Sequence, residues 1–106
     1  MSSNPDIVIV GGGGIGSAIA YFLTREPGAP SVRVYERDPS YARAATTLAA
    51  GGIRQMFSTP ENIRMSQYGF EFLASSACDL AVDGVQPDFG LQACPYLRLL
   101  PEESRD

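Results

Sequence analysis

Two features in the first third of the chain have residue types and spacing that could do chemistry. Gly11, Gly13 and Gly16 fit the pattern G-x-G-x-x-G. Glycines at these positions allow a tight turn, the close approach of a phosphate group to the backbone, and close packing of a helix on a strand. Glu36 adds a carboxylate, which accepts hydrogen bonds from hydroxyl groups. The pair indicates a site for a ligand that carries both phosphates and hydroxyls.

The elements around these residues have the order that such a site needs. The continuous apolar run from Ile7 to Val10 predicts a strand of a parallel sheet, covered by helices on both faces. A helix is expected from about residue 14 to residue 25, with an apolar face and with its N-terminus at the glycine turn, where it favours anions. A second strand is expected over residues 32–35. Glu36 ends that strand, twenty residues after Gly16. This arrangement predicts a dinucleotide-binding βαβ unit, and the acid favours FAD or NAD over NADP.

The alternative for the glycines is a turn with no ligand, because glycine-rich turns are common. Their position between a strand and a helix, followed by an acid at the expected distance, favours the dinucleotide. Gly12 and Gly14 have no assigned task in this spacing pattern and are interpreted as permissive.

The remainder of the chain is less regular. Residues 41–50 are predicted as a short helix or an ordered loop. A longer helix is expected from Ser58 to about Cys78, with Ser58 as its cap and Glu61 in the first turn. Residues 79–87 are predicted as a loop. Two short apolar segments, 89–91 and 96–100, are candidates for an edge hairpin of a different sheet.

Composition excludes several classes of protein. The 106 residues carry a net charge of −4 and no lysine, which argues against a nucleic-acid or anionic-membrane surface. Histidine is absent, and Cys78 and Cys94 lie far apart, so we expect neither a metal site nor a Ser-His-Asp or Cys-His pair. No signal peptide or membrane span is recognisable, and the expected location is the cytoplasm.

Several segments together resemble a known family. They are Gly11–Ser17 followed by Ala20–Leu23, the pair Glu36-Arg37, and Ala49–Ser58 with Pro60–Asn62. The chain is similar to the opening of the D-amino-acid oxidase/glycine oxidase/sarcosine oxidase superfamily of FAD-dependent oxidoreductases. The Gly51–Arg54 segment is similar to the branch with dimethylglycine and sarcosine dehydrogenase-type proteins and FAD-dependent oxidoreductase-domain proteins. The resemblance covers nearly all of this chain but only about the first quarter of a family member.

The resemblance implies roles for individual residues. The turn would bind the FAD pyrophosphate, Glu36 would hold the adenosine ribose, and Arg37 would lie beside the adenine end. Arg54 would sit near the isoalloxazine, where a cation stabilises negative charge on the reduced flavin or attracts a substrate carboxylate. The alternative for Arg54 is a surface or interdomain salt bridge. The full set of implied cofactor residues is Gly11, Gly13, Gly14, Ile15, Gly16, Glu36, Arg37, Thr46, Thr47, Gly51 and Gly52.

The predicted fold class is therefore α/β. We expect the N-terminal part of a Rossmann-like FAD-binding domain of the glutathione-reductase type over residues 1–78, and the beginning of a substrate-domain sheet over residues 79–106. The implied activity is oxidation of the C–N bond of an amino acid or N-methyl amine to an imine, with oxygen or an electron-transfer acceptor as partner. The alternatives are an NAD-binding dehydrogenase domain and a truncated nucleotide-binding module without catalysis. We expect no turnover from these 106 residues alone.

Overall fold

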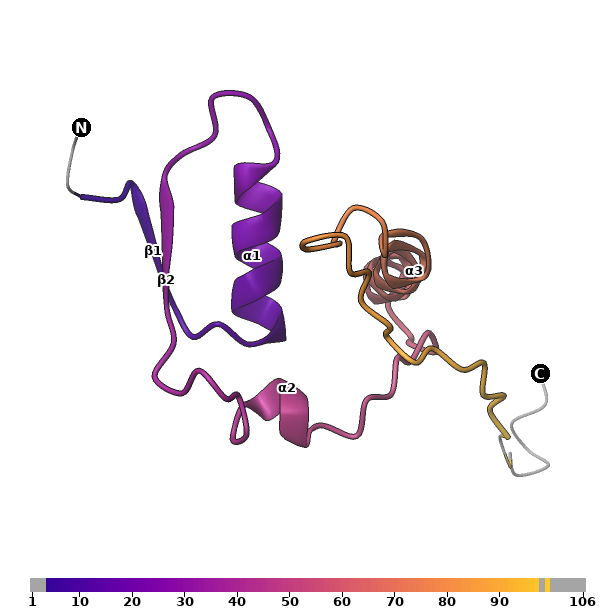
Figure 1. Cartoon of the computed structure of the whole chain (residues 1–106). Helices are drawn as coiled ribbons and strands as arrows, with labels where there is room; N and C mark the ends of the chain where they lie inside the picture. The colour runs from indigo at the N-terminus through magenta and orange to yellow at the C-terminus, as the bar shows by residue number, and fades with distance from the viewer. Residues whose placement is uncertain (1–3, 98, 100–106) are drawn as a thin grey trace. The chain divides into compact units, whose positions relative to one another are not determined.

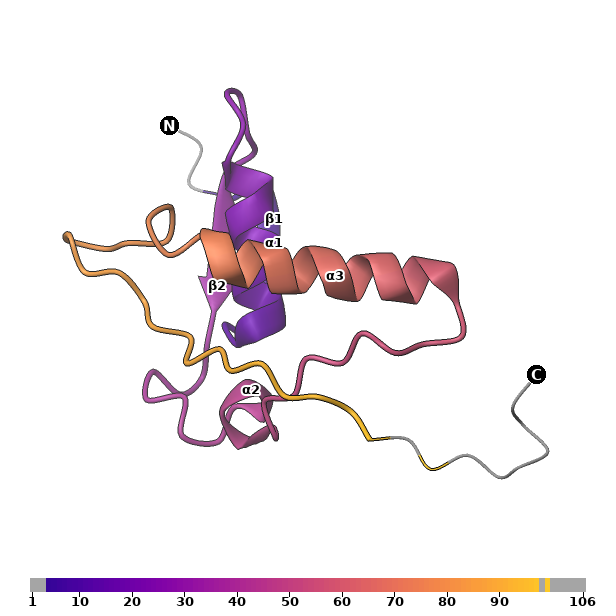
Figure 2. The same cartoon turned by 90° about the vertical axis from the view of Figure 1, so that its right-hand side faces the viewer.

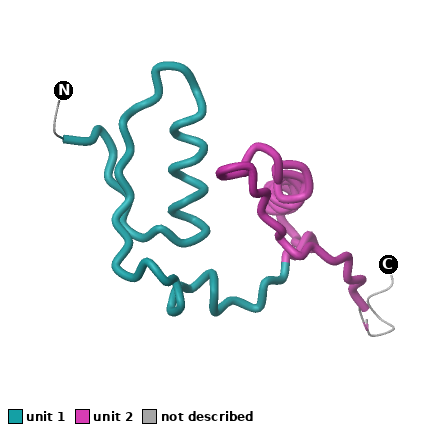
Figure 3. Tube along the Cα trace, viewed as in Figure 1, with its two compact units in different colours: residues 1–52 teal, residues 53–106 magenta. Residues whose placement is uncertain are grey.

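The structure is a computed structural model that describes residues 4–97 and 99. Its elements follow the order β1, α1, β2, α2, α3 (Figure 1). The chain divides into two compact units, residues 1–52 and residues 53–106 (Figure 3). The boundary that we predict from the sequence at residue 78 concerns whole domains and stays a prediction.

The first unit is a strand–helix–strand motif. Strand β1 (Ile7–Val10) pairs in parallel with β2 (Val32–Tyr35), with Ile7 opposite Val32 and Val10 opposite Tyr35. Helix α1 (Gly14–Thr24) connects the two strands and lies along them (Figures 1 and 2). Parallel neighbours require such a crossover connection. The α/β class and the βαβ start are confirmed.

Only one face of this sheet is covered by described residues. Ile7 and Ile9 are half-buried, whereas Val8 and Val10 are exposed, Val10 to 88%. The expectation that helices cover both faces of β1 is therefore not met among the described residues. The continuous apolar run is consistent with a two-sided cover, but it does not itself supply the second layer.

Polar side chains close the sheet at the start of both strands. The Asp6 carboxylate accepts hydrogen bonds from the backbone N–H and the hydroxyl of Ser31, at 2.8 and 2.7 Å. These bonds lower the pKa of Asp6 below its usual range, with the bond from the Ser31 hydroxyl as the largest cause. Ser31 in turn accepts a bond from the Asp6 backbone N–H at 3.0 Å. This clasp aligns the two strands and supports their parallel register.

The two later helices differ in part from the sequence prediction. Residues 45–48 form a one-turn helix, α2 (Ala45–Leu48), which is one of the two forms expected for this segment. Helix α3 (Pro60–Ser75) begins after Thr59, and its cap makes no side-chain hydrogen bond, so the prediction of a Ser58 cap is wrong. The helix also ends three residues before Cys78, at Ser75, and Ser76 follows as its C-cap with φ of −95° and ψ of 11°. A turn over residues 76–80 follows.

The predicted second sheet does not form in the described residues. Residues 89–91 are in no strand, since Gly90 adopts a left-handed φ of 58° and its N–H bonds to the Asp88 carboxylate at 2.8 Å. Tyr96 and Leu97 are in no strand either, and the end of that candidate, residues 98 and 100, lies outside the described residues. A two-stranded hairpin is marginal without a packing partner. The predicted loop over residues 79–87 is confirmed, with one isolated bridge between Val82 and Val85.

Candidate cofactor site

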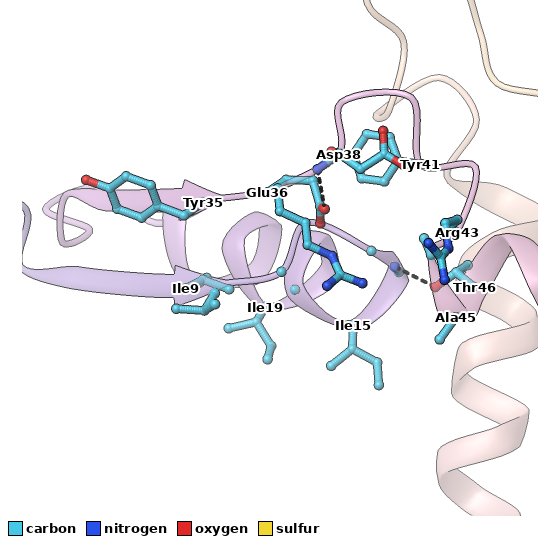
Figure 4. Close-up of a pocket in the computed structure, with 17 residues that line it drawn as sticks. Ile9, Ile15, Ile19, Tyr35, Glu36, Asp38, Tyr41, Arg43, Ala45 and Thr46 are labelled. Carbon is cyan, nitrogen blue, oxygen red and sulfur yellow. Dashed lines mark hydrogen bonds between the residues drawn. The ribbon is translucent and has the colours of Figure 1, made fainter.

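The first unit contains an open cleft at the carboxyl ends of its two strands (Figure 4). Its volume is about 1210 Å³. In parallel α/β sheets, ligands bind outside the carboxyl ends of the strands. The lining comes from the strand ends, the glycine turn, the first turns of α1 and the segment after β2: Ile9, Val10, Gly11, Gly13, Gly14, Ile15, Gly16, Ile19, Tyr35, Glu36, Arg37, Asp38, Tyr41, Arg43, Ala44, Ala45 and Thr46.

The glycine turn has the geometry that its spacing predicts. Gly11 adopts φ of 99°, which side chains other than hydrogen rarely allow, and its N–H donates to the Tyr35 carbonyl at 2.8 Å. A Cβ on Gly16 would stand 1.9 Å from the Gly11 carbonyl oxygen. Close packing of α1 on the turn therefore requires glycine at position 16.

Backbone donors at the start of α1 are available to a ligand. The helix has no side-chain cap and no acidic residue in its first turn. Among the described residues, the N–H groups of Gly13, Ile15 and Gly16 have no hydrogen-bond acceptor. A helix N-terminus with free N–H groups and a positive dipole end binds phosphates. This donor set fits the pyrophosphate of a dinucleotide.

Glu36 lies at one side of this cleft and is held by the backbone. Its Oε2 accepts a hydrogen bond from the Gly12 N–H at 2.8 Å, and its Oε1 accepts one from the Asp38 N–H at 3.0 Å. The bond from Asp38, followed by that from Gly12, lowers the pKa of Glu36 below its usual range. The group is thus an oriented carboxylate at neutral pH. Its remaining lone pairs can accept hydrogen bonds from ribose hydroxyls.

The segment that follows β2 reaches back to the glycine turn. The Thr46 hydroxyl accepts a hydrogen bond from the Gly14 N–H at 2.9 Å, which ties α2 to the start of α1 (Figure 4). Arg37 also lines the cleft. Thr47, Gly51 and Gly52 are exposed and are not among its lining residues. The structure thus brings together Gly11, Gly13, Gly14, Ile15, Gly16, Glu36, Arg37 and Thr46 from the predicted set.

Arg54 belongs to the second unit, close after Gly52. Its Nε donates to the Met56 carbonyl at 2.7 Å, and its guanidinium carbon stands 4.8 Å from the centre of the Phe57 ring. Among the described residues it forms no ion pair. The Arg54 side chain is exposed and retains free donors.

Sequence reasoning missed several lining residues of the cleft, and two of them, Arg43 and Tyr41, could contact a ligand. Arg43 and Tyr41 follow β2, and both line the cleft (Figure 4). A guanidinium at the wall favours an anionic ligand, and an arginine between Glu36 and Thr46 was the available signal for Arg43. Tyr41 adopts a left-handed φ of 56°. No sequence pattern for a tyrosine indicates that conformation, so nothing in the sequence pointed to Tyr41.

Comparison with known families decides the cofactor. A family model described as "FAD dependent oxidoreductase" matches residues 6–106. The chain belongs to this family. FAD is accordingly the cofactor. Membership in this family gives no support to the NAD-binding alternative.

Curated relatives agree with this membership. The protein named FAD-dependent oxidoreductase domain-containing protein 1 from Bos taurus is 48% identical over 103 residues, which is 92% of this chain and 21% of the relative. The Xenopus laevis protein of that name is 48% identical over 102 residues, or 92% of this chain and 20% of the relative. A Drosophila melanogaster homolog is 47% identical over 72 residues, which is 67% of this chain and 14% of the homolog. The chain thus spans about a fifth of the length of the first two. No solved structure matches it significantly.

Two negative findings apply to the part of the chain that the structure describes. No helix there combines the length and apolar composition needed to cross a membrane. No three His, Cys, Asp or Glu side chains there gather closely enough to hold a metal ion.

Proposed function

We propose that this chain supplies the FAD-binding start of an oxidoreductase that converts the C–N bond of an amino acid or N-methyl amine to an imine. The observation that carries the cofactor part is the open set of backbone donors at Gly13, Ile15 and Gly16 beside the oriented Glu36 carboxylate. The substrate part is supported by the resemblance of the Gly51–Arg54 segment to amine-oxidising flavoproteins and by the free donors of Arg54.

Different residues of the chain would contact different parts of the cofactor. The glycine turn and the N-terminus of α1 would bind the pyrophosphate, and Glu36 would accept bonds from the ribose. When bound, the flavin supplies an acceptor for the hydride equivalent that leaves the carbon of the C–N bond. Arg54 would attract a substrate carboxylate or stabilise negative charge near the flavin ring. Oxygen or an electron-transfer partner would then accept the electrons.

The test uses the full-length polypeptide that contains these residues. Its visible absorption spectrum is recorded first, followed by anaerobic additions of sarcosine and of several amino acids. Flavin bands that bleach with an amine support both parts of the proposal. Flavin bands that no amine bleaches retain the cofactor site and contradict the substrate class.

The same measurement separates the remaining alternatives. A full-length polypeptide that binds nucleotide but shows no flavin bands would contradict the cofactor part and favour a non-catalytic module. The isolated 106-residue chain is the control, and we expect it to show no turnover because it spans only about a fifth of the length of the first two curated relatives.

A further inference from the structure

Tyr41 has a backbone conformation that its side chain disfavours. Its φ of 56° lies in the left-handed region, where a bulky aromatic residue is a genuine outlier. Two backbone bonds hold this turn, from Tyr41 N–H to the Asp38 carbonyl and from Ala44 N–H to the Tyr41 carbonyl, both at 3.0 Å. Glycine would adopt the same φ at lower cost. Strained residues of this kind cluster at ligand clamps, so the presence of tyrosine here indicates a role for its side chain.

The phenol of Tyr41 lies over the second glycine of the turn. A Cβ on Gly12 would stand 2.9 Å from the Tyr41 hydroxyl oxygen and 3.4 Å from the Cβ of Glu36. Gly12 is buried and its φ is not in the left-handed region, so its own backbone does not demand glycine. The space above Gly12 is instead filled by the tyrosine. This gives Gly12, which the sequence pattern left without a task, a specific reason to lack a side chain.

Tyr41, Glu36 and Asp38 line one wall of the cleft, and Gly12, which does not line it, is joined to Glu36 by a hydrogen bond. Gly12 and Asp38 donate their N–H groups to the two oxygens of Glu36, and Asp38 also accepts the Tyr41 N–H. The ring covers Gly12 while 39% of the Tyr41 surface remains exposed. Figure 4 shows Tyr41 beside Asp38 at the end of the cleft where Glu36 lies. A shift of the ring would uncover Gly12, whose N–H donates to the Glu36 carboxylate.

We propose that Tyr41 is a positioning residue for FAD, a role that rests on the proposed cofactor site. The left-handed turn holds its ring over Gly12, and the ring keeps Glu36 oriented toward the ligand. Removal of the ring leaves Gly12 uncovered, and insertion of a methyl group at Gly12 displaces the ring. The two changes therefore act on the same contact and are not additive.

The first test measures the dissociation constant of FAD by flavin fluorescence in the full-length polypeptide. We expect Tyr41→Ala and Gly12→Ala each to weaken binding about tenfold, or 1.4 kcal/mol. The double variant should bind no more weakly than the weaker single variant. Tyr41→Phe keeps the ring and should stay within about threefold of the unchanged protein. Gly69→Ala is the control, because a Cβ there meets no atom within 4 Å.

A second readout separates positioning from a role in folding alone. Without FAD, Tyr41→Gly should melt a few degrees higher than Tyr41→Ala, because glycine tolerates the left-handed φ. Both variants should nevertheless bind FAD about tenfold more weakly. If Tyr41→Gly restores the original affinity, the tyrosine serves only the turn and the proposal is wrong.

The outcomes distinguish this role from the cofactor site itself. An unchanged FAD affinity in Tyr41→Ala overturns the role of Tyr41 and leaves the site intact. Additive losses in the double variant overturn the shared contact with Gly12. A full-length polypeptide without any FAD affinity overturns the proposed cofactor site, and the role of Tyr41 with it.

Discussion

The two units of the chain are held by hydrogen bonds of different range. In the first unit, bonds join residues far apart in sequence: Asp6 with Ser31, Gly12 with Glu36, and Gly14 with Thr46. In the described part of the second unit they join near neighbours, as in Arg54 with Met56 and Asp88 with Gly90. Bonds within the first unit therefore orient its candidate cofactor residues. In the described part of the second unit, Arg54 lies in a segment without regular structure and takes part in no hydrogen bond of comparable range.

The largest expected effect is at the tightest point of the first unit. Gly16→Ala would place a Cβ 1.9 Å from the Gly11 carbonyl oxygen, so the backbone of the turn must move. We expect a loss of about 3 kcal/mol or more in unfolding free energy, and loss of FAD. Denaturant unfolding of the full-length polypeptide measures the first, and its flavin absorbance the second.

Gly69→Ala in α3 is the counterpart in the second unit. A Cβ there meets no atom within 4 Å, and alanine is favoured over glycine in a helix by about 1 kcal/mol. We expect equal or higher stability with FAD retained. A loss of stability similar to that of Gly16→Ala would show that the contrast between the units does not determine how well each tolerates a substitution.

A change at Arg54 should affect chemistry and not cofactor retention. If its cation acts near the reacting groups, Arg54→Ala should lower kcat about a hundredfold, or 2.7 kcal/mol. FAD affinity should stay unchanged, since the cleft residues all belong to the first unit. Stopped-flow reduction by the active amine measures the rate. If the flavin of the variant is reduced at the original rate, the result would favour the salt-bridge or surface alternative for Arg54.

Removal of the Thr46 hydroxyl tests one long-range bond. Thr46→Ala leaves the Gly14 N–H without its partner, and we expect about 1 kcal/mol of lost stability together with weaker FAD binding. Thr46→Ser keeps the hydroxyl and should retain most of both. Thr47→Ala, at a residue outside the cleft lining, should have the smaller effect. The opposite order would assign the cofactor contact to Thr47. Isothermal titration with FAD and thermal unfolding give the two quantities.

The smallest effect concerns pH. The pKa of Glu36 is lowered in the folded chain, chiefly by the Asp38 N–H and then by the Gly12 N–H. Its stabilisation is present above the ordinary glutamate pKa of about 4.3 and is lost as the pH falls through the lower folded value. We expect FAD retention to decline below about pH 4.3. Glu36→Gln should bind more weakly at neutral pH and show a flatter pH profile in a fluorescence titration. Equal slopes would exclude Glu36 as the titrating group.

The sequence by itself determined the local elements of the first unit. An unbroken apolar run, a glycine pattern, an amphipathic helix and an acid after the second strand each act over a few residues, and together they predict β1, α1, β2 and the place of Glu36. The same reasoning failed at residues 89–91 and at the Ser58 cap. Strand formation depends on a pairing strand, which composition does not identify. Hydroxyl residues next to a helix start compete for the capping position.

Only the tertiary structure decided how the cleft is assembled. The bond from Gly14 to Thr46 spans 32 residues, and the bonds to Glu36 depend on where the segment after β2 returns. The left-handed turn at Tyr41, which fills the space above Gly12, has no signature in the residue types. Such contacts arise from the path of the backbone through space, and spacing along the chain specifies that path only within single elements.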